Sequence, residues 1–188
     1  MTPAEESLAA IETELNEAVA QARQLVETTE GRLFTVRPDP MSWSAAECIA
    51  HLSLSTESFL PIVDKAIEDG RKRRLESTKQ PKLDMLGRLL HWMMEPPVRK
   101  RYPTSRPFVP KSARAKAEAL AEFTSLQTKL IERVRAARGL DLRRMKVKSP
   151  FNDKISYNLY SAFRIIAAHE RRHLWQAAQA VAALRRTA

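Results

Sequence analysis

The segment ISYNLYSAFRIIAAHERRHLWQAAQAVAALRR, residues 155–186, carries apolar residues at steps of three and four. This spacing predicts a long amphipathic helix that buries one face. The buried face is expected to combine apolar residues with two histidines: Leu159, Ala162, Ile166, His169, His173, Ala177, Ala180 and Leu184. Because this face packs against the rest of the protein, both histidines are expected to lie inside it.

Three earlier segments show the same helical pattern, at about residues 3–29, 45–69 and 113–138. Ser44 and Glu47 fit a capping box before the second of them, and Ser112 and Gly139 are the expected N-cap and stop of the third. No strict alternation of apolar and polar residues is evident, so no sheet is expected. Four long helices bury their faces most simply side by side, which predicts an all-α fold, a four-helix bundle.

The composition indicates a single domain over residues 1–188. With 44% hydrophobic residues the chain can bury a core, and its one cysteine excludes an intrachain disulfide. We expect a cytoplasmic protein without a membrane span, because the N-terminal region has no continuous apolar run. Residues 71–111 form an irregular, basic and proline-rich insert with one short helix, LDMLGRLLHWMM, at 83–94.

The five residues HERRH, 169–173, match the H-E-x-x-H pattern of zinc proteases, in which two histidines bind zinc and the glutamate is the general base. His169 and His173 differ by about 40° around a helix, so both rings can reach one ion. A protease of this type takes a third ligand from downstream, and no His, Asp, Glu or Cys follows His173. The sequence therefore still predicts that His169 and His173 bind a metal, and it argues against a protease.

His51 is the candidate for the third ligand, because it lies on the predicted inner face of the second helix. Facing helices of a bundle build metal sites in this way. Three histidines with open positions are typical of a catalytic site, and Zn, Ni, Fe or Mn can each accept three imidazoles. The alternative is three core histidines without an ion. His91, the fourth histidine, is expected to pack rather than to bind the metal.

The motifs Trp43-Ser44, Glu47, His51-Leu52 and AAHERRHLWQA resemble the DinB-like superfamily, the damage-inducible and YfiT-related proteins. The resemblance spans the four long helices. It implies an up-down-down-up bundle with a divalent metal held by three histidines. Characterised relatives include S-transferases and isomerases that use low-molecular-weight thiols, and YfiT was proposed as a metal-dependent hydrolase. The insert at 71–111 departs from the family pattern.

These features predict a metal-dependent transferase or hydrolase with a small-molecule substrate and, for a transferase, a low-molecular-weight thiol cosubstrate. Glu47 and Glu170 are candidate catalytic residues, Glu47 with capping as its alternative role. Gln176 is expected beside the metal ligands, because it lies one turn after His173. A homodimer is left open.

The competing hypothesis is a non-enzymatic basic module that binds nucleic acid or another anionic partner. Its support is a formal net charge of +10 and three clusters of cations that can contact phosphates. These clusters are Arg71 to Arg74, Arg99 to Arg101, and Arg143, Arg144, Lys146 and Lys148. No nucleic-acid-binding motif accompanies them.

Overall fold

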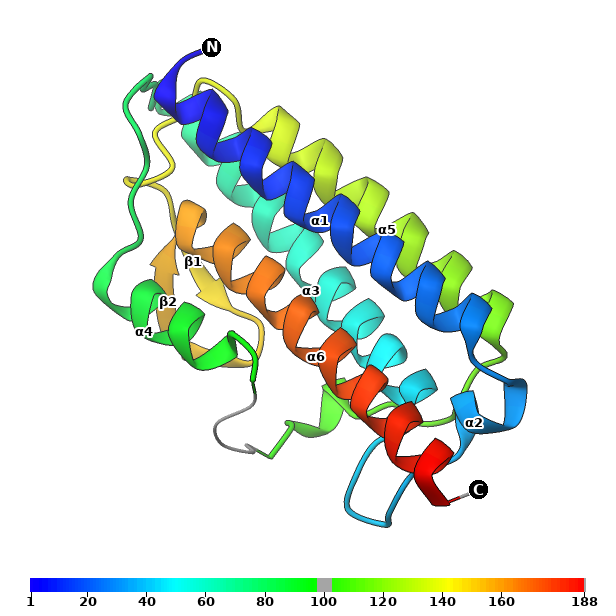
Figure 1. The fold of residues 1–188 in the computed structure, drawn as a ribbon. Helices are drawn as coiled ribbons and strands as arrows, with labels where there is room; N and C mark the ends of the chain where they lie inside the picture. Colours follow the sequence, from blue (N-terminus) through cyan, green and yellow to red (C-terminus); the bar gives the residue numbers. More distant parts are fainter. Residues whose placement is uncertain (98–102, 188) are drawn as a thin grey trace.

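The computed structural model describes residues 1–97 and 103–187 and is largely helical (Figure 1). Most of the described chain lies in four long helices: α1 (Pro3–Thr28), α3 (Ala45–Lys72), α5 (Lys116–Ala136) and α6 (Leu159–Thr187). The shorter elements are α2 (Gly31–Thr35), α4 (Met85–Met94) and the 3-10 turn η1 (Arg106–Phe108). The predicted helical class is confirmed.

The four long helices pack around a shared core. α1 contacts α5 and α6, and α3 contacts the same two helices, so α1 lies opposite α3. α1 and α6 run in one direction, and α3 and α5 run in the other (Figure 1). Capping boxes start α1 at Thr2 with Glu5 and α3 at Ser44 with Glu47, the second of which confirms the predicted cap.

A small antiparallel hairpin, β1 (Lys146–Ser149) and β2 (Asn152–Asn158), corrects the expectation of no sheet. It also moves the start of α6 from the expected Ile155 to Leu159. The physical reason lies in β1, where exposed Lys146 and Lys148 alternate with buried Val147 and Ser149. This alternation covers only four residues in a basic segment, so the sequence pattern is too weak to predict a strand.

The helix α5 begins later than its pattern suggests. The N-cap is Ala115 and not Ser112 as expected. The methyl side chain of Ala115 cannot accept a hydrogen bond. Lys116 instead donates to the carbonyl oxygen of Thr29, which ties this end of α5 to the end of α1. Gly139 follows α5 with φ of +80°, the left-handed conformation that suits the predicted stop. The Arg99 to Arg101 cluster lies outside the described residues.

The core divides into two apolar clusters along the bundle. One cluster includes Phe59 of α3 and Ala167 of α6, and the other includes Leu52 of α3 and Leu174 of α6. Five buried polar side chains lie on α3, α5 and α6 among these apolar residues: His51, Thr56, Gln127, Glu170 and His173. These side chains form a polar layer inside the bundle, which includes His51 and His173.

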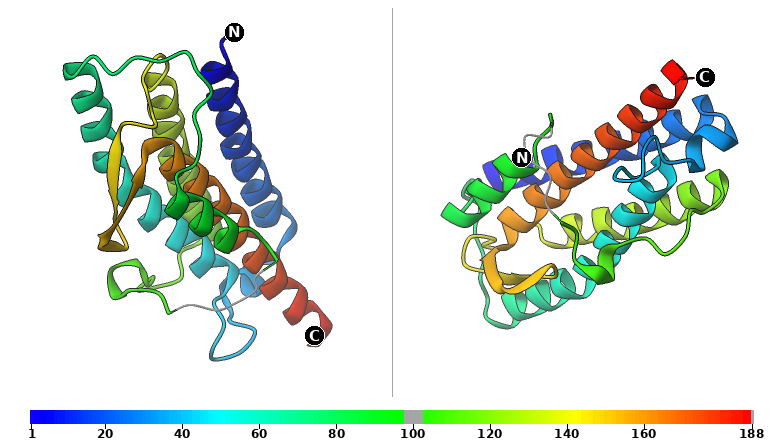
Figure 2. Two further views of the ribbon diagram at one scale, coloured as in Figure 1. Left: turned by 90° about the vertical axis from the view of Figure 1, so that its left-hand side faces the viewer. Right: turned by 90° about the horizontal axis from the view of Figure 1, so that it is seen from below.

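The insert and the hairpin cover the groove between α3 and α6. α4 packs on α6 and β2, while β1 packs on α3, so both elements lie on one side of the bundle (Figure 2). Asp84 caps α4 by accepting from the backbone N–H of Gly87 at 2.8 Å, and it also accepts from the N–H of Asn158 at 2.7 Å. Within the described residues, no helix is both long and apolar enough to cross a membrane.

Candidate metal centre

Three histidines from two helices meet between α3 and α6. His51 lies on α3, and His169 and His173 lie one turn apart on α6, so the predicted ligands come together. Their ligand nitrogens all lie within 4.8 Å of one another. Nε2 of His51 and Nε2 of His169 are 3.2 Å apart. Two nitrogens bound to one ion at about 2.0–2.1 Å are roughly 3.0–3.4 Å apart, so this spacing fits a shared divalent ion.

A backbone carbonyl sets the tautomer of His51. Its Nδ1 lies 2.7 Å from the carbonyl oxygen of Phe108 in η1. Because a carbonyl oxygen only accepts, Nδ1 carries the proton and donates, and Nε2 of the neutral ring presents a lone pair. Metal-binding histidines usually have such a partner on the nitrogen that does not bind. The insert thus orients the ring of His51.

His173 has a buried nitrogen that hydrogen bonds do not satisfy. Its Nδ1 has no hydrogen-bond partner within the described part of the chain, and an unpaired buried group of this kind costs about 1–3 kcal/mol. The ring centroids of His51 and His173 are 4.4 Å apart, and Trp43 stacks on His173 at 6.0 Å. A buried imidazole nitrogen without a hydrogen-bond partner, next to two other imidazoles, suits an ion better than a hydrogen-bonded core.

The three rings are neutral at neutral pH. Burial lowers the pKa of His51, and it lowers those of His169 and His173 well below the ordinary value of 6.5. Repulsion from the neighbouring rings and from Arg172 lowers the pKa of His169 and His173 further, while Gln176 acts in the opposite direction on His173. The neutral imidazole is the form that binds a metal, so the site is electrostatically prepared for one.

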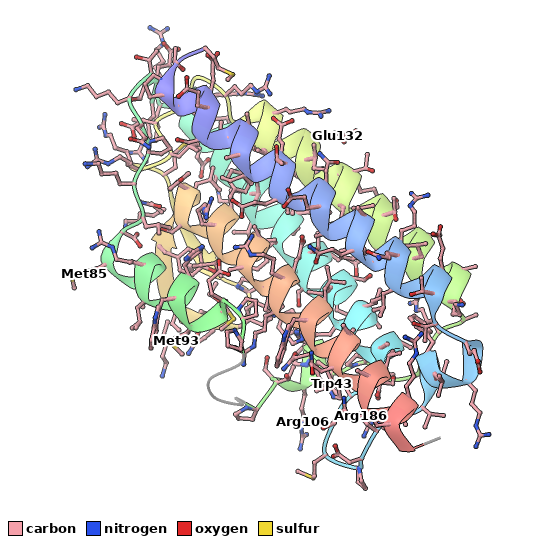
Figure 3. The ribbon with its side chains drawn as sticks, in the orientation of Figure 1. Trp43, Met85, Met93, Arg106, Glu132 and Arg186 are labelled. Atoms are coloured by element: carbon pink, nitrogen blue, oxygen red, sulfur yellow. The ribbon has the colours of Figure 1, made fainter. Side chains whose placement is uncertain are left out.

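A cavity of about 1190 Å³ opens onto the three histidines. Apolar walls come from α4, the hairpin and the loop before α3: Leu90, Met94, Phe151, Ile155 and Trp43. The wall formed by α6 mixes polar side chains, such as Gln176 and Gln179, with apolar ones, such as Ile165 and Trp175, and it includes Arg186, which Figure 3 labels. A mixed lining of this size suits a small molecule that can reach the metal ligands.

The comparison with protein families agrees with this geometry. The family model of the DinB superfamily matches residues 14–177, from the middle of α1 to most of α6. The chain belongs to the DinB superfamily. No curated protein and no solved structure matches it. The match includes all three histidines, so the predicted family is confirmed.

In this DinB protein Glu47 is held by its neighbours. Both of its carboxylate oxygens accept from Arg37, at 2.5–3.1 Å, and one also accepts from the backbone N–H of Ser44 at 2.9 Å. Burial alone would raise the pKa of Glu47, but the bonds from Arg37 and Ser44 hold it below the ordinary value. Glu47 is absent from the described cavity lining. Its capping role is observed, and its catalytic role stays a prediction.

Glu170 lies in the polar layer and not on the cavity wall formed by the described residues. It is 1% exposed, and its Oε1 accepts from Nε2 of Gln127 on α5 at 2.6 Å. Burial raises its pKa to about 8, against the opposing effects of Gln127 and Arg171. The carboxyl group therefore faces the bundle interior, and its catalytic role stays a prediction.

Gln176 and Cys48 line the cavity, and His91 is not among its described lining residues. Gln176 lines the cavity and interacts with His173, as its position one turn later predicts. Cys48 also lines the cavity, but burial raises the pKa of its thiol to about 12, so the thiolate is scarce at neutral pH. His91 lies apart from the cluster, with Nε2 at 3.2 Å from Glu95. The structure thus adds no fourth histidine to the site.

Two residues of the site are not expected from the sequence. Phe108 contributes a backbone atom, which no side-chain pattern reveals. Arg172 is buried on the cavity wall between the two histidines of α6, although an arginine in such a motif is expected to be exposed. The available signal for Arg172 is its helical position, three residues after His169 and next to His173.

The buried Glu170 predicts an unusual pH dependence of stability in the metal-free protein. Because its folded pKa is about 8 instead of 4.5, the native state holds a proton that the unfolded chain releases across this window, so the free energy of unfolding falls as pH rises. The histidines, whose pKa values are lowered, act in the opposite direction up to about pH 7.5, because their imidazoles still bind protons in the unfolded chain there. Urea unfolding with EDTA should therefore show a loss of about 2 kcal/mol between roughly pH 6.5 and 8 relative to a variant in which residue 170 cannot titrate.

Glu170→Gln is the matched variant, because the amide keeps the acceptor for Gln127 and cannot titrate. Its free energy of unfolding should lack this loss and rise slightly over the same pH range, as the histidines of the unfolded chain lose their protons. Parallel pH curves for the wild type and the variant would show that Glu170 is ionised in the native state.

Proposed function

We propose that this DinB protein binds one divalent metal ion through His51, His169 and His173 and uses it in the reaction of a small molecule. The observation that carries the proposal is the convergence of three neutral imidazoles, with donor nitrogens within 4.8 Å, at the base of a cavity. The directions of the four long helices support the up-down-down-up bundle that the family implies (Figure 1). We place the protein in the cytoplasm.

Transfer to a low-molecular-weight thiol is the proposed reaction, and hydrolysis is the second candidate. A bound divalent ion lowers the pKa of a thiol or of water and so supplies a nucleophile near neutral pH. His51, fixed by Phe108, keeps its lone pair directed at the site. Trp43 and Phe151 pack against the histidine rings and exclude bulk water. The cavity leaves room for the electrophile.

The basic-module hypothesis has less support. Several cations of the described clusters have partners within the protein: Lys72 pairs with Glu68, Arg71 donates to the carbonyl oxygen of Ala136, and Lys146 pairs with Asp84. Surface cations engaged in this way are common on solvated faces. The buried histidine cluster, in contrast, has no simple structural role.

Turnover by protein loaded with Zn, Ni, Fe(II) or Mn tests the proposal. The assay offers a panel of low-molecular-weight thiols with an aryl halide acceptor, so that a carbon–sulfur bond forms, halide leaves and the thiol proton passes to solvent. Activated esters test hydrolysis in parallel. We expect product formation that depends on both metal and thiol and is lost in His169→Ala. Equal rates with wild type, His169→Ala and free metal ion would contradict the proposal.

A further inference from the structure

The described lining of the cavity beside the histidines holds more cationic than acidic side chains. Arg172 and Arg186 both line it, and among the described lining residues Asp39 is the sole acid. Three neutral imidazoles leave the charge of a bound divalent ion uncompensated. Glu47 is paired with Arg37, and Glu170 points into the bundle, so neither carboxylate offsets this charge from within the cavity.

Arg172 is the cation closest in the chain to the metal ligands. It is 5% exposed, and its NH1 donates to the carbonyl oxygen of Met93 at 3.0 Å, which fixes the side chain between α6 and the end of α4. Its charge acts on the rings of both His169 and His173. Arg172 therefore lies at the metal site and on the cavity wall at once.

Apolar side chains line the same cavity as Arg172, among them Leu90, Met94 and Phe151. An apolar surrounding strengthens charge-assisted hydrogen bonds, because it screens them less than water does. A planar guanidinium also presents a pair of donors that matches a carboxylate. The local chemistry thus favours an anionic group held next to a reactive centre at the metal.

We infer that Arg172 recognises a carboxylate of the small-molecule substrate while another group of the same molecule reaches the histidine site. The inference rests on the proposed metal-dependent function and adds the substrate class, a small carboxylate-bearing molecule such as an anionic thiol. Gln176 and Gln179, on the same helix, extend the polar wall along which such a molecule lies. Arg172 is a specificity-determining residue in this scheme.

Two thiols of two carbons each test the inference: thioglycolate, which carries a carboxylate, and β-mercaptoethanol, which carries a hydroxyl group. Calorimetric titration of zinc-loaded full-length protein should show thioglycolate binding at least about tenfold more tightly. Arg172→Gln should lose most of this preference and retain its zinc content, and Arg172→Lys should restore part of it. Arg186→Gln removes the same charge from the exposed end of the same wall and should keep the preference.

If Arg172→Gln still prefers thioglycolate, the metal ion alone causes the preference and the inference is overturned. A wild type that shows no preference between the two thiols would also overturn it. A second measurement needs no variant: acetate should compete with thioglycolate more strongly than with β-mercaptoethanol, and equal competition would also overturn it. Zinc bound without a preference contradicts only this inference, whereas absence of zinc contradicts the proposed function as well.

Discussion

Zinc affinity is expected to fall by at least about 100-fold when His51 is replaced by alanine, because one of three ligands is lost. The remaining pair, His169 and His173, comes from a single helix and cannot enclose an ion between α3 and α6. The bond from His51 to the carbonyl oxygen of Phe108 is lost too, so this end of the insert loses an anchor. Competition with a chromogenic chelator measures the affinity.

His91→Ala is the matched control, because it removes the one other histidine of the chain from a position outside the cluster. Its zinc affinity should equal that of the wild type. Metal-dependent turnover should follow affinity in both variants. An unchanged affinity in His51→Ala would show that the ion, if bound, does not use α3.

Gly87→Ala is expected to destabilise the protein by about 3 kcal/mol or more, through overpacking. A Cβ at this position of α4 would lie 2.1 Å from Oγ and 2.3 Å from Cβ of Ser161, at the start of α6. A Cβ atom cannot rotate away, so α4 must move outward. Because Leu90 and Met94 of α4 line the cavity, the same change should open it. Urea unfolding measures the loss of stability.

Ser161→Gly in the Gly87→Ala background tests the cause, since it removes the two closest of the three clashing atoms and leaves only Oδ1 of Asp84 at 2.9 Å. The double variant should be more stable than Gly87→Ala, even though Ser161→Gly alone loses the hydrogen bond from the N–H of Asp84 to Ser161 Oγ. Leu86→Ala, which is also on α4 but does not create a clash, serves as a comparison for local packing. Additive effects of the two changes would contradict close packing of α4 on α6.

Much of the bundle and of the histidine cluster follows from helical periodicity. The apolar residues at steps of three and four in residues 155–186 place His169 and His173 on an inner face. The cap at Ser44 fixes where α3 begins, so that His51 faces inward as well. Each conclusion depends on contacts within one turn of helix, where spacing determines direction. The meeting of the three rings then follows from packing of the two faces.

The segments that cover the histidines, which are η1 and the hairpin, cannot be predicted from helical periodicity. Phe108 orients His51 over a separation of 57 residues, through a carbonyl that every residue possesses. The hairpin is specified by four residues of β1 and by its contact with α3, not by a strong local pattern. Arg172 is buried and bonded to the backbone of Met93 at the end of α4. These features depend on tertiary contacts that irregular segments make, and periodicity carries no information about them.

The metal content of untagged wild-type protein tests the central claim most directly. After removal of adventitious ions and resupply with Zn, Ni, Fe(II) or Mn, elemental analysis should find about one tightly held divalent ion per chain. His169→Ala prepared in parallel should contain almost none. A wild type that holds no stoichiometric ion with any of these metals would show that His51, His169 and His173 form a buried polar cluster and not a metal centre.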